Sequence, residues 1–411
     1  MAATDLSAFD TTFERMESRL SVAGLFAGIG GLERGLGAAG LQAELLCEWW
    51  DPAQRVLTEH WPDIPLVSDV RDLTSLPVVD VVTAGFPCTD LSQAGRTAGI
   101  TGAASGLVGE VFRLLDDADP SWLVMENVRN MLVLDGGRAM RFLVDALEAR
   151  GMRWTYRLVD SRFTGVPQRR QRVILVASRR EDPRGVLLSD QAEHFDEEMD
   201  EELHGFYWTE GLKGIGWAVD AVPTLKGGST VGIASPPAIW VRGAELGRRL
   251  VTPGIEDAEA LQGFPRGWTA AAQVAGRRNG PRWKLVGNAV TVGVAEWLGR
   301  RLVTPGAPPT EATRVPAGTR WPTSAWGDSG EVWTAGTSLW PEDRPYRHLR
   351  NVVDVRTANP LSHRAVRGLG NRMARSSLRF EPGFRQAVAD HLVHSDLPAE
   401  SQLWDAHVAV G

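Results

Sequence analysis

The sequence has few cysteines, few lysines and no long apolar segment. Its two cysteines, Cys47 and Cys88, are too few for a disulfide framework or a zinc site with four cysteine ligands. We therefore expect no metal site, and an intracellular, reducing environment is the simplest interpretation. No segment approaches the roughly 18 uncharged apolar residues of a membrane-spanning helix. Residues 1–20 also lack the basic start and apolar run of a signal peptide, so we expect no membrane association.

Positive charge comes almost entirely from arginine, because only three lysines occur. The formal net charge of −7 does not by itself indicate a nucleic-acid-binding protein. The charge is unevenly spread, however, with seven arginines in residues 162–184 and ten arginines and lysines in residues 242–301. Residues 190–202 contain eight carboxylates, and we interpret them as a solvated face or linker. Net charge therefore does not exclude a nucleic-acid partner.

Short apolar runs alternate with amphipathic segments through the first half of the chain. The runs typical of buried strands are residues 22–26, 45–48, 78–84, 122–126 and 173–177. The amphipathic segments lie near residues 30–39, 51–60, 106–118 and 136–150. This alternation predicts an α/β fold around a parallel sheet, in which ligands bind at the carboxyl ends of the strands.

The 411 residues are too many for one ordinary core, so we expect more than one structural unit. Residues 1–18 are predicted to be an N-terminal tail and residues 19–178 the sheet domain. Residues 179–282, rich in glycine, proline and acidic residues at their start, are predicted to form a separate small unit. The chain then returns to the sheet domain at 283–303. The Pro- and Trp-rich segment after residue 304 leads into a C-terminal extension, 304–411, with helical periodicity near 345–395.

A glycine-rich turn, LFAGIGGLERGLGAAG, follows the first predicted strand at residues 25–40. Such turns bring backbone close to NAD, FAD or S-adenosylmethionine alike, and the spacing departs from the dinucleotide fingerprint. Glu48 and Trp49 follow the second strand, where a carboxylate can bind ribose hydroxyls and an indole can pack on adenine. Asp69, after the next short strand, is suited to accept from an adenine amine. Together these strand ends favour a cofactor that contains adenosine.

Three further segments carry reactive groups. Cys88 follows Pro87 in a Gly/Pro/Ser-containing loop, where a nucleophile can be exposed, whereas Cys47 lies in an apolar run and is interpreted as inert. In WLVMENV, residues 122–128, a strand ends in Glu126, whose half-buried carboxyl can donate a proton or hydrogen bond. In GVPQRRQRVILVAS, residues 165–178, Arg170 and Arg172 alternate, so we expect both to point the same way. Their guanidinium groups suit a base carbonyl or a phosphate; a solvated basic edge is the alternative.

Taken together, these motifs resemble those of the DNA cytosine-5 methyltransferase family. FAGIGG, EWW, the Asp69 strand end, GFPC, ENV, QRRQR and KLVGNAV occur in the order typical of that family, over most of residues 21–303. The segment RRLVTPGIEDAEALQGFP, 248–265, also looks like the one that precedes the family's last motif. Three positions depart from the pattern: Gly24 where aspartate is common, and Thr89 and Leu285 where glutamine is frequent.

The resemblance implies a Rossmann-like S-adenosylmethionine methyltransferase sheet with a small target-recognition domain at 179–282. A cytosine swings out of the duplex into the pocket. Cys88 adds to C6 of the base, Glu126 contacts N3 and the exocyclic amine, and Arg172, with Arg170 nearby, holds O2 and the sugar-phosphate. The activity implied is that of a DNA (cytosine-5-)-methyltransferase. It also implies double-stranded DNA as partner, a cognate restriction endonuclease or another defence component, a monomer on DNA, and a bacterial cytoplasmic protein that joins the nucleoid on DNA.

The resemblance also assigns binding residues. Those expected to hold S-adenosylmethionine are Phe26, Ala27, Gly28, Ile29, Gly30, Gly31, Glu48, Trp49, Asp69, Val70, Gly85, Pro87, Asn288 and Val290. Those expected to contact DNA are Ser92, Gln93, Gln168 and Arg169.

Three alternatives remain at this point. A tRNA cytosine-5 methyltransferase shares the fold and the glutamate. A Rossmann oxidoreductase explains the glycine turn and Glu48 but gives no role to Cys88, Glu126 and the arginine pair together. A catalytically inactive DNA-binding relative is disfavoured because Cys88 and Glu126 are both present.

Overall fold

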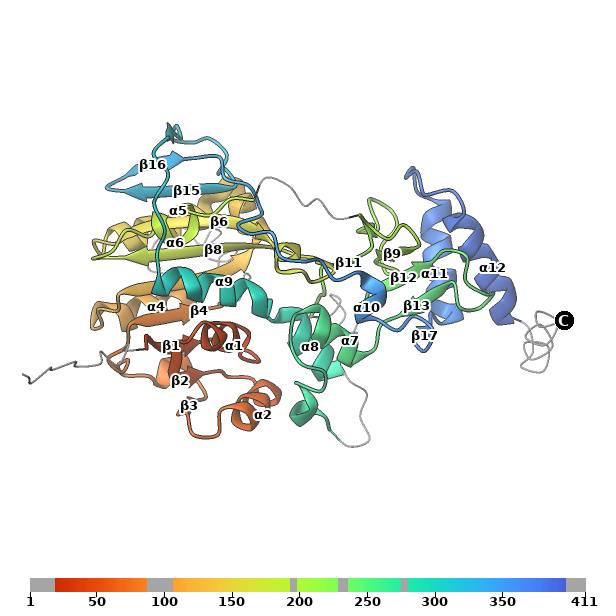
Figure 1. Ribbon diagram of the computed structural model, residues 1–411, viewed down its shortest axis with the longest axis horizontal. Helices are drawn as coiled ribbons and strands as arrows, with labels where there is room; N and C mark the ends of the chain where they lie inside the picture. Colours follow the sequence, from red (N-terminus) through yellow and green to blue (C-terminus); the bar gives the residue numbers. More distant parts are fainter. Residues whose placement is uncertain (1–18, 87–105, 193–197, 228–235, 275–279, 397–411) are drawn as a thin grey trace, which may run out of the picture.

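The computed structural model describes residues 19–86, 106–192, 198–227, 236–274 and 280–396. Within these residues the chain forms two units, a larger one built on a ten-stranded sheet and a smaller one built on a five-stranded sheet (Figure 1). No helix of the described chain is long and apolar enough to cross a bilayer.

The parallel half of the large sheet has the strand order β3-β2-β1-β4-β5, which confirms the predicted α/β fold. The order reverses between β1 and β4, and this is the point at which doubly wound sheets bind ligands. Its strands start and end close to the predicted positions: β1 (Ser21–Leu25), β2 (Gln42–Cys47), β3 (Leu66–Val67), β4 (Val81–Ala84) and β5 (Trp122–Val128).

Helices cover both faces of this sheet, because successive residues of a buried strand point to opposite sides. One face packs against α4 (Gly106–Asp116) and α5 (Arg138–Glu148). The other packs against α1 (Gly31–Ala38), α6 (Arg184–Leu187) and α9 (Val292–Val303). Helix α2 (Asp51–His60) instead packs toward the smaller unit. The 3-10 helices are η1 (Val70–Asp72), η3 (Arg129–Leu132), η4 (Leu134–Gly137), η5 (Ser161–Thr164) and η6 (Ala270–Ala272).

Beyond β5 the sheet becomes antiparallel and takes in part of the predicted C-terminal extension. β8 (Gln171–Ser178) lies between β5 and β6 (Arg153–Asp160) and is antiparallel to both. The edge is then continued by β15 (Ser324–Asp328), β16 (Glu331–Thr334) and β14 (Thr313–Arg314). The segment after residue 304 is therefore not a linker into a separate extension: it completes the large sheet.

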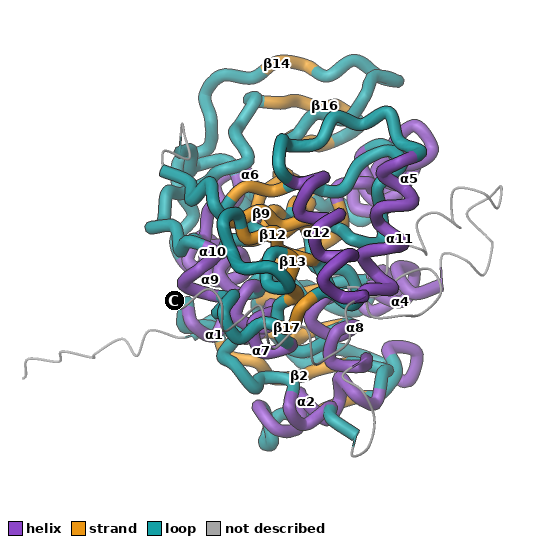
Figure 2. Tube along the Cα trace, turned by 90° about the vertical axis from the view of Figure 1, so that its right-hand side faces the viewer, coloured by secondary structure: helices purple, strands orange, loops and turns teal. Residues whose placement is uncertain are grey.

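The smaller unit contains strands from residues 179–282, the predicted target-recognition region, and the rest of the C-terminal segment (Figure 2). Its sheet has the order β10-β9-β12-β13-β17, and β17 comes from the C-terminal part of the chain. Helices α11 (His363–Ala374) and α12 (Phe384–Asp396) pack on this sheet through an apolar core around Phe206, Trp240 and Phe384. The remaining elements are β7 (Gln168–Arg169), β9 (Leu203–Phe206), β10 (Ala218–Val219), β11 (Val222–Pro223), β12 (Ala238–Val241), β13 (Leu250–Thr252), β17 (Asn359–Pro360), α7 (Ile255–Leu261), α8 (Gly280–Asn288) and α10 (Leu349–Val352).

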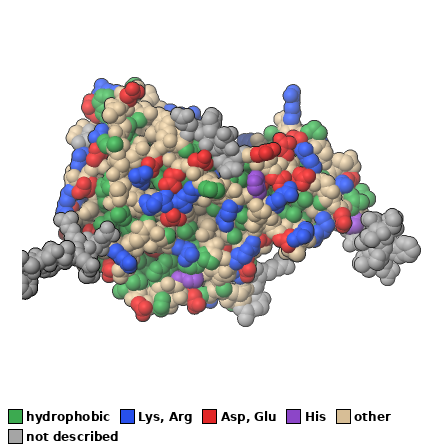
Figure 3. All heavy atoms as spheres, in the orientation of Figure 1, with side chains coloured by type: hydrophobic (Ala, Val, Ile, Leu, Met, Phe, Trp, Pro, Cys, Tyr) green, Lys and Arg blue, Asp and Glu red, His purple; other side chains and the backbone are tan. Residues whose placement is uncertain are grey.

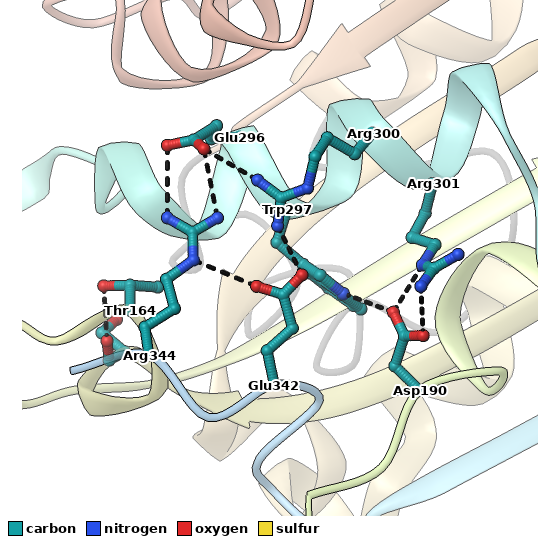
Figure 4. A network of polar contacts seen from close by, with 9 residues as sticks. Thr164, Asp190, Glu296, Trp297, Arg300, Arg301, Glu342 and Arg344 are labelled. Carbon is teal, nitrogen blue, oxygen red and sulfur yellow. Dashed lines mark hydrogen bonds and ion pairs between the residues drawn. The ribbon is translucent and has the colours of Figure 1, made fainter.

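Residues 335–348 cross from the large sheet to the smaller unit over α9. On α9, Glu296 accepts two hydrogen bonds from Arg344 and one from Arg300, and Glu342 contacts both arginines (Figure 4). At the far end, the Asp220 carboxylate accepts from His348 Nδ1 at 2.6 Å and from Leu349 N at 2.8 Å. The segment therefore ties the two units together.

The acidic segment takes part in the same connections. Asp190 is bound by Arg301 and by Trp297 Nε1, as Figure 4 shows. Asp200 is ion-paired with Arg350. Asp190 and Asp200 therefore hold elements together, and for these two residues the interpretation as a solvated face is wrong.

Candidate active site

A cavity of about 550 Å³ opens at the carboxyl ends of β1, β2, β4 and β5, closed on one side by α8 and the turn after it. Its volume lies in the range of small-molecule sites. Eleven of the predicted site residues line it: Phe26, Ala27, Gly28, Gly31, Glu48, Trp49, Gly85, Glu126, Arg172, Asn288 and Val290. The cavity therefore brings together segments from six places in the sequence.

The glycine-rich turn is held in an unusual backbone conformation. Phe26 has a φ of 57°, in the left-handed region that non-glycine residues rarely adopt and that is often found at functional sites. The turn continues into α1 at Gly31. A Cβ on Gly31 would lie 2.5 Å from Val290 O, so only glycine allows this close approach to the opposite wall. The turn and the Asn288–Val290 segment are therefore packed backbone to backbone.

Glu48 fixes the shape of the turn. Its carboxylate accepts from Gly28 N at 2.9 Å and from Trp50 N at 2.8 Å. Burial raises the pKa of Glu48 above its usual value. The neighbouring Trp49 side chain lines the cavity yet is 74% exposed, so a large apolar face is open to a ligand.

Glu126 and Arg172 form an ion pair at the cavity wall. They lie on the neighbouring antiparallel strands β5 and β8, where Glu126 is paired with Ile174 and Arg172 with Val128, and Arg172 Nε lies 2.8 Å from Glu126 Oε1. The two side chains are only 10% and 12% exposed. An oriented pair of a carboxylate and a fork of N–H donors can bind the polar edge of a planar heterocycle.

Asn127 connects this strand end to the segment that precedes the predicted nucleophile. Its Nδ2 donates to Phe86 O at 3.2 Å, and its Oδ1 accepts from Val128 N at 2.8 Å. Phe86 is buried and is the last described residue before Pro87. The predicted site residues Pro87, Cys88, Ser92 and Gln93 lie outside the described residues.

Arg170 does not point the same way as Arg172, contrary to the expectation from alternation. Its side chain is fully buried, and it donates to the backbone carbonyls of Leu225, Gly287 and Ala289. The reason is a break between β7 and β8 at this residue, which turns the side chain away from the cavity. The guanidinium therefore holds a wall of the cavity and does not meet a ligand.

Gln168 is likewise not available to DNA. It is fully buried, donates to Gln262 Oε1 at 3.0 Å and accepts from Leu225 N at 2.9 Å, because β7 pairs with β11 inside the smaller unit. Arg169, the next residue, has an exposed side chain and remains compatible with a DNA contact.

Of the predicted cofactor residues that the structure describes, four do not line the cavity. Ile29 is buried, with its carbonyl accepting from Trp268 Nε1, and Gly30 and Val70 support the turn and η1. Asp69 is paired with Arg71, and this contact lowers the pKa of its carboxyl. Asp69 therefore meets a ligand only if that pair opens.

Sequence reasoning missed several lining residues, among them Leu32, Trp50, Phe86 and Lys284. Each lies within a motif quoted above but was not assigned a role, and Lys284 Nζ lies 4.5 Å from the centre of the Trp50 ring. Cys47, in contrast, is buried, and burial raises the pKa of its thiol to about 12, as expected for an inert cysteine.

The fold is that of a Rossmann-like methyltransferase. The chain superposes on the crystal structure of the S. pombe Dnmt2 methyltransferase with a TM-score of 0.51 at 15% identity, covering 69% of this chain and 98% of that one. The Entamoeba histolytica methyltransferase EhMeth gives 0.50 at 13% identity, covering 70% and 98%. At these identities the likeness shows the fold alone.

Sequence relatives identify the family. Residues 20–215 match the C-5 cytosine-specific DNA methylases. The chain is 41% identical over 370 residues to the type II methyltransferase M2.BsuMI of Bacillus subtilis strain 168, covering 87% of this chain and 94% of that protein. A shorter match to M.BsuFI of Bacillus subtilis is 30% identical over 160 residues, covering 38% and 39%. The chain therefore belongs to the C-5 cytosine-specific DNA methylase family.

Proposed function

We propose that this chain methylates carbon 5 of a cytosine in a specific duplex DNA sequence, with S-adenosylmethionine as donor and Cys88 as nucleophile. The observation that carries the proposal is the Glu126–Arg172 pair, which shares one cavity with the glycine-rich turn. The names of the relatives support a role as the modification enzyme of a restriction–modification system. In that setting the partners are double-stranded DNA and a cognate endonuclease, and one copy acts on each site.

The cavity suits an adenosine-containing methyl donor. The Glu48 carboxylate, the open Trp49 face and the backbone of Ala27–Gly28 would hold it. A Cβ on Gly85 would have Phe26 O, 3.7 Å away, as its nearest neighbour, so the floor of the cavity is open at this position. When bound, S-adenosylmethionine supplies an electrophilic methyl group.

The chain's own residues activate the base. The Cys88 thiolate forms a bond to C6, and the electron pair of the C5–C6 double bond makes C5 nucleophilic. Glu126 holds N3 and the exocyclic amine, where negative charge develops, and Arg172 orients Glu126 and binds O2. Once C5 is methylated, water takes the C5 proton, the double bond reforms and the Cys88 sulfur leaves. Arg170 is a positioning residue, since it acts through the 287–289 wall.

A trapping experiment tests this mechanism. Duplex DNA containing 5-fluorocytosine should form a covalent adduct, because fluorine cannot leave as the proton does. The Cys88→Ala variant should form none, while Cys47→Ala, which removes the other cysteine, should still form it. An adduct that survives in Cys88→Ala would refute the assignment of the nucleophile. Methyl transfer to tRNA and not to duplex DNA would refute the substrate.

A further inference from the structure

The outward face of α11 carries a stripe of arginines. Arg364 and Arg367 are exposed on the helix, and Arg375, also exposed, directly follows its last residue; their spacing of three and eight residues places them on the same side. The opposite side of the helix is buried against the five-stranded sheet through Val366, Leu369 and Met373. The stripe is therefore fixed on a packed element and faces solvent.

The charge of this stripe is not neutralised by neighbouring acids. Residues 363–396 contain six arginines, no lysine and three acidic residues, a net charge of +3 in a chain whose formal net charge is −7. Across the face in Figure 3, basic and acidic side chains are interspersed. Among the described residues, however, none of the three stripe arginines forms an ion pair with a carboxylate. Such a stripe attracts a polyanion.

A short series of contacts connects α11 to the cavity. Gly227 packs on the cavity residue Asn288, since a Cβ at Gly227 would lie 2.2 Å from Asn288 Oδ1. The adjoining Lys226 is ion-paired with Glu210. Arg372 of α11 then donates to Glu210 O at 3.0 Å. Helix α11, which lies toward the right-hand end of the molecule in Figure 1, is thus connected through Glu210 and Lys226 to the segment beside the cavity.

We propose that Arg364, Arg367 and Arg375 bind the phosphate backbone of duplex DNA that flanks the methylated site. The inference rests on the proposed action on DNA. From Arg364 to Ala374, the residue before Arg375, the helix extends about 15 Å, roughly half a turn of B-DNA. Arginine forks match phosphate oxygens, and such contacts position a protein on the duplex without reading its sequence. The C-terminal segment thereby adds affinity that is independent of target recognition.

The test compares a triple variant, R364Q/R367Q/R375Q, with a charge-matched control, R138Q/R314Q/R320Q. The control removes three exposed arginines from the larger unit, on and near α5 and β14. Glutamine keeps the helix propensity of the stripe positions. Binding to a mixed-sequence duplex of about four helical turns is measured by fluorescence anisotropy over a series of salt concentrations. In parallel, methyl incorporation into plasmid DNA is measured.

The stripe variant should lower the slope of log affinity against log salt by about 3, one for each phosphate that the variant no longer binds. The control should leave the slope unchanged, and both variants should keep wild-type turnover at saturating DNA. An unchanged slope in the stripe variant, or an equal decrease in the control, would overturn the inference. If the wild-type protein failed to methylate plasmid DNA at all, the proposed function would be refuted, whatever the salt dependence of the stripe variant.

Discussion

Glu33 makes the stability of this protein depend on pH in a direction that can be measured. The residue lies in the first turn of α1, directly beneath the glycine-rich turn, and is 4% exposed. A Cβ at Gly24 on β1 would lie 2.3 Å from Glu33 Oε1, so the carboxyl occupies the space that a larger residue at Gly24 would fill. Thr83 Oγ1 donates to the same oxygen over 3.4 Å. Burial raises the pKa of Glu33 from 4.5 to about 7.

The sign of the effect follows from proton binding. Between pH 4.5 and 7 the unfolded chain has released this proton while the folded chain retains it, so the free energy of unfolding falls as pH rises. Between about pH 5 and pH 8 the two pKa values correspond to a loss of about 2.5 kcal/mol. The decrease in the free energy of unfolding is complete only above the pKa of Glu33 in the folded protein, about 7.

Urea unfolding followed by tryptophan fluorescence checks this value. Glu33→Gln removes the titrating group, so its stability relative to wild type should rise by about 2 to 3 kcal/mol from about pH 5 to pH 8. The contributions of all other titrating groups are the same in both proteins, so they cancel when the free energy of unfolding of Glu33→Gln is compared with that of wild type. Glu44→Gln, at an exposed glutamate on β2, should show no such change. A difference between Glu33→Gln and wild type that is equal at both pH values would refute the reasoning.

Three more outcomes are expected. Glu259→Ala should destabilise the protein by about 3 to 5 kcal/mol in thermal unfolding, because it leaves the buried guanidinium of Arg282, 2.9 Å from the carboxylate, without its partner. Trp49→Ala should leave thermal stability unchanged, since the side chain is 74% exposed, but weaken S-adenosylmethionine binding about tenfold in calorimetry. Asn127→Ala removes the hydrogen bond to Phe86 O and should lower kcat with little change in the KM for S-adenosylmethionine; an effect on KM alone would contradict a role in positioning the loop.

The parallel half of the sheet could be predicted from the sequence because its signals are local. Buried parallel strands appear as short apolar runs, and the predicted runs from 22–26 to 122–126 coincide with β1, β2, β4 and β5. The glycine turn follows one such run, and Glu48 and Glu126 are the last residues of two others, so their meeting in one cavity follows from the topology.

The rest depended on contacts between distant residues. β6 was not predicted, and it carries the fully buried Arg157, which donates to the carbonyls of Leu187, Asp190 and Ser338. A charged residue within a strand usually indicates an exposed face. Arg157 can be buried because carbonyl groups 30 to 181 residues away accept its hydrogen bonds. The burial of Arg170 has the same cause. Alternation in the sequence indicates to which side of a strand a side chain points, but it does not show where the strand is interrupted, as it is at Arg170 between β7 and β8.

The division of the C-terminal segment between both units changes what counts as the core of this protein. Residues 313–334 form the edge of the large sheet, and residues 359–396 supply a strand and two helices to the smaller one. The 41% identical relative matches over 87% of this chain, more than residues 1–303 could supply, so the relationship extends into this segment. Residues 335–348 connect the two units across α9, through the contact of Arg344 with Glu296 and that of His348 with Asp220. The C-terminal segment is therefore best understood as part of the frame that holds the larger and the smaller unit together.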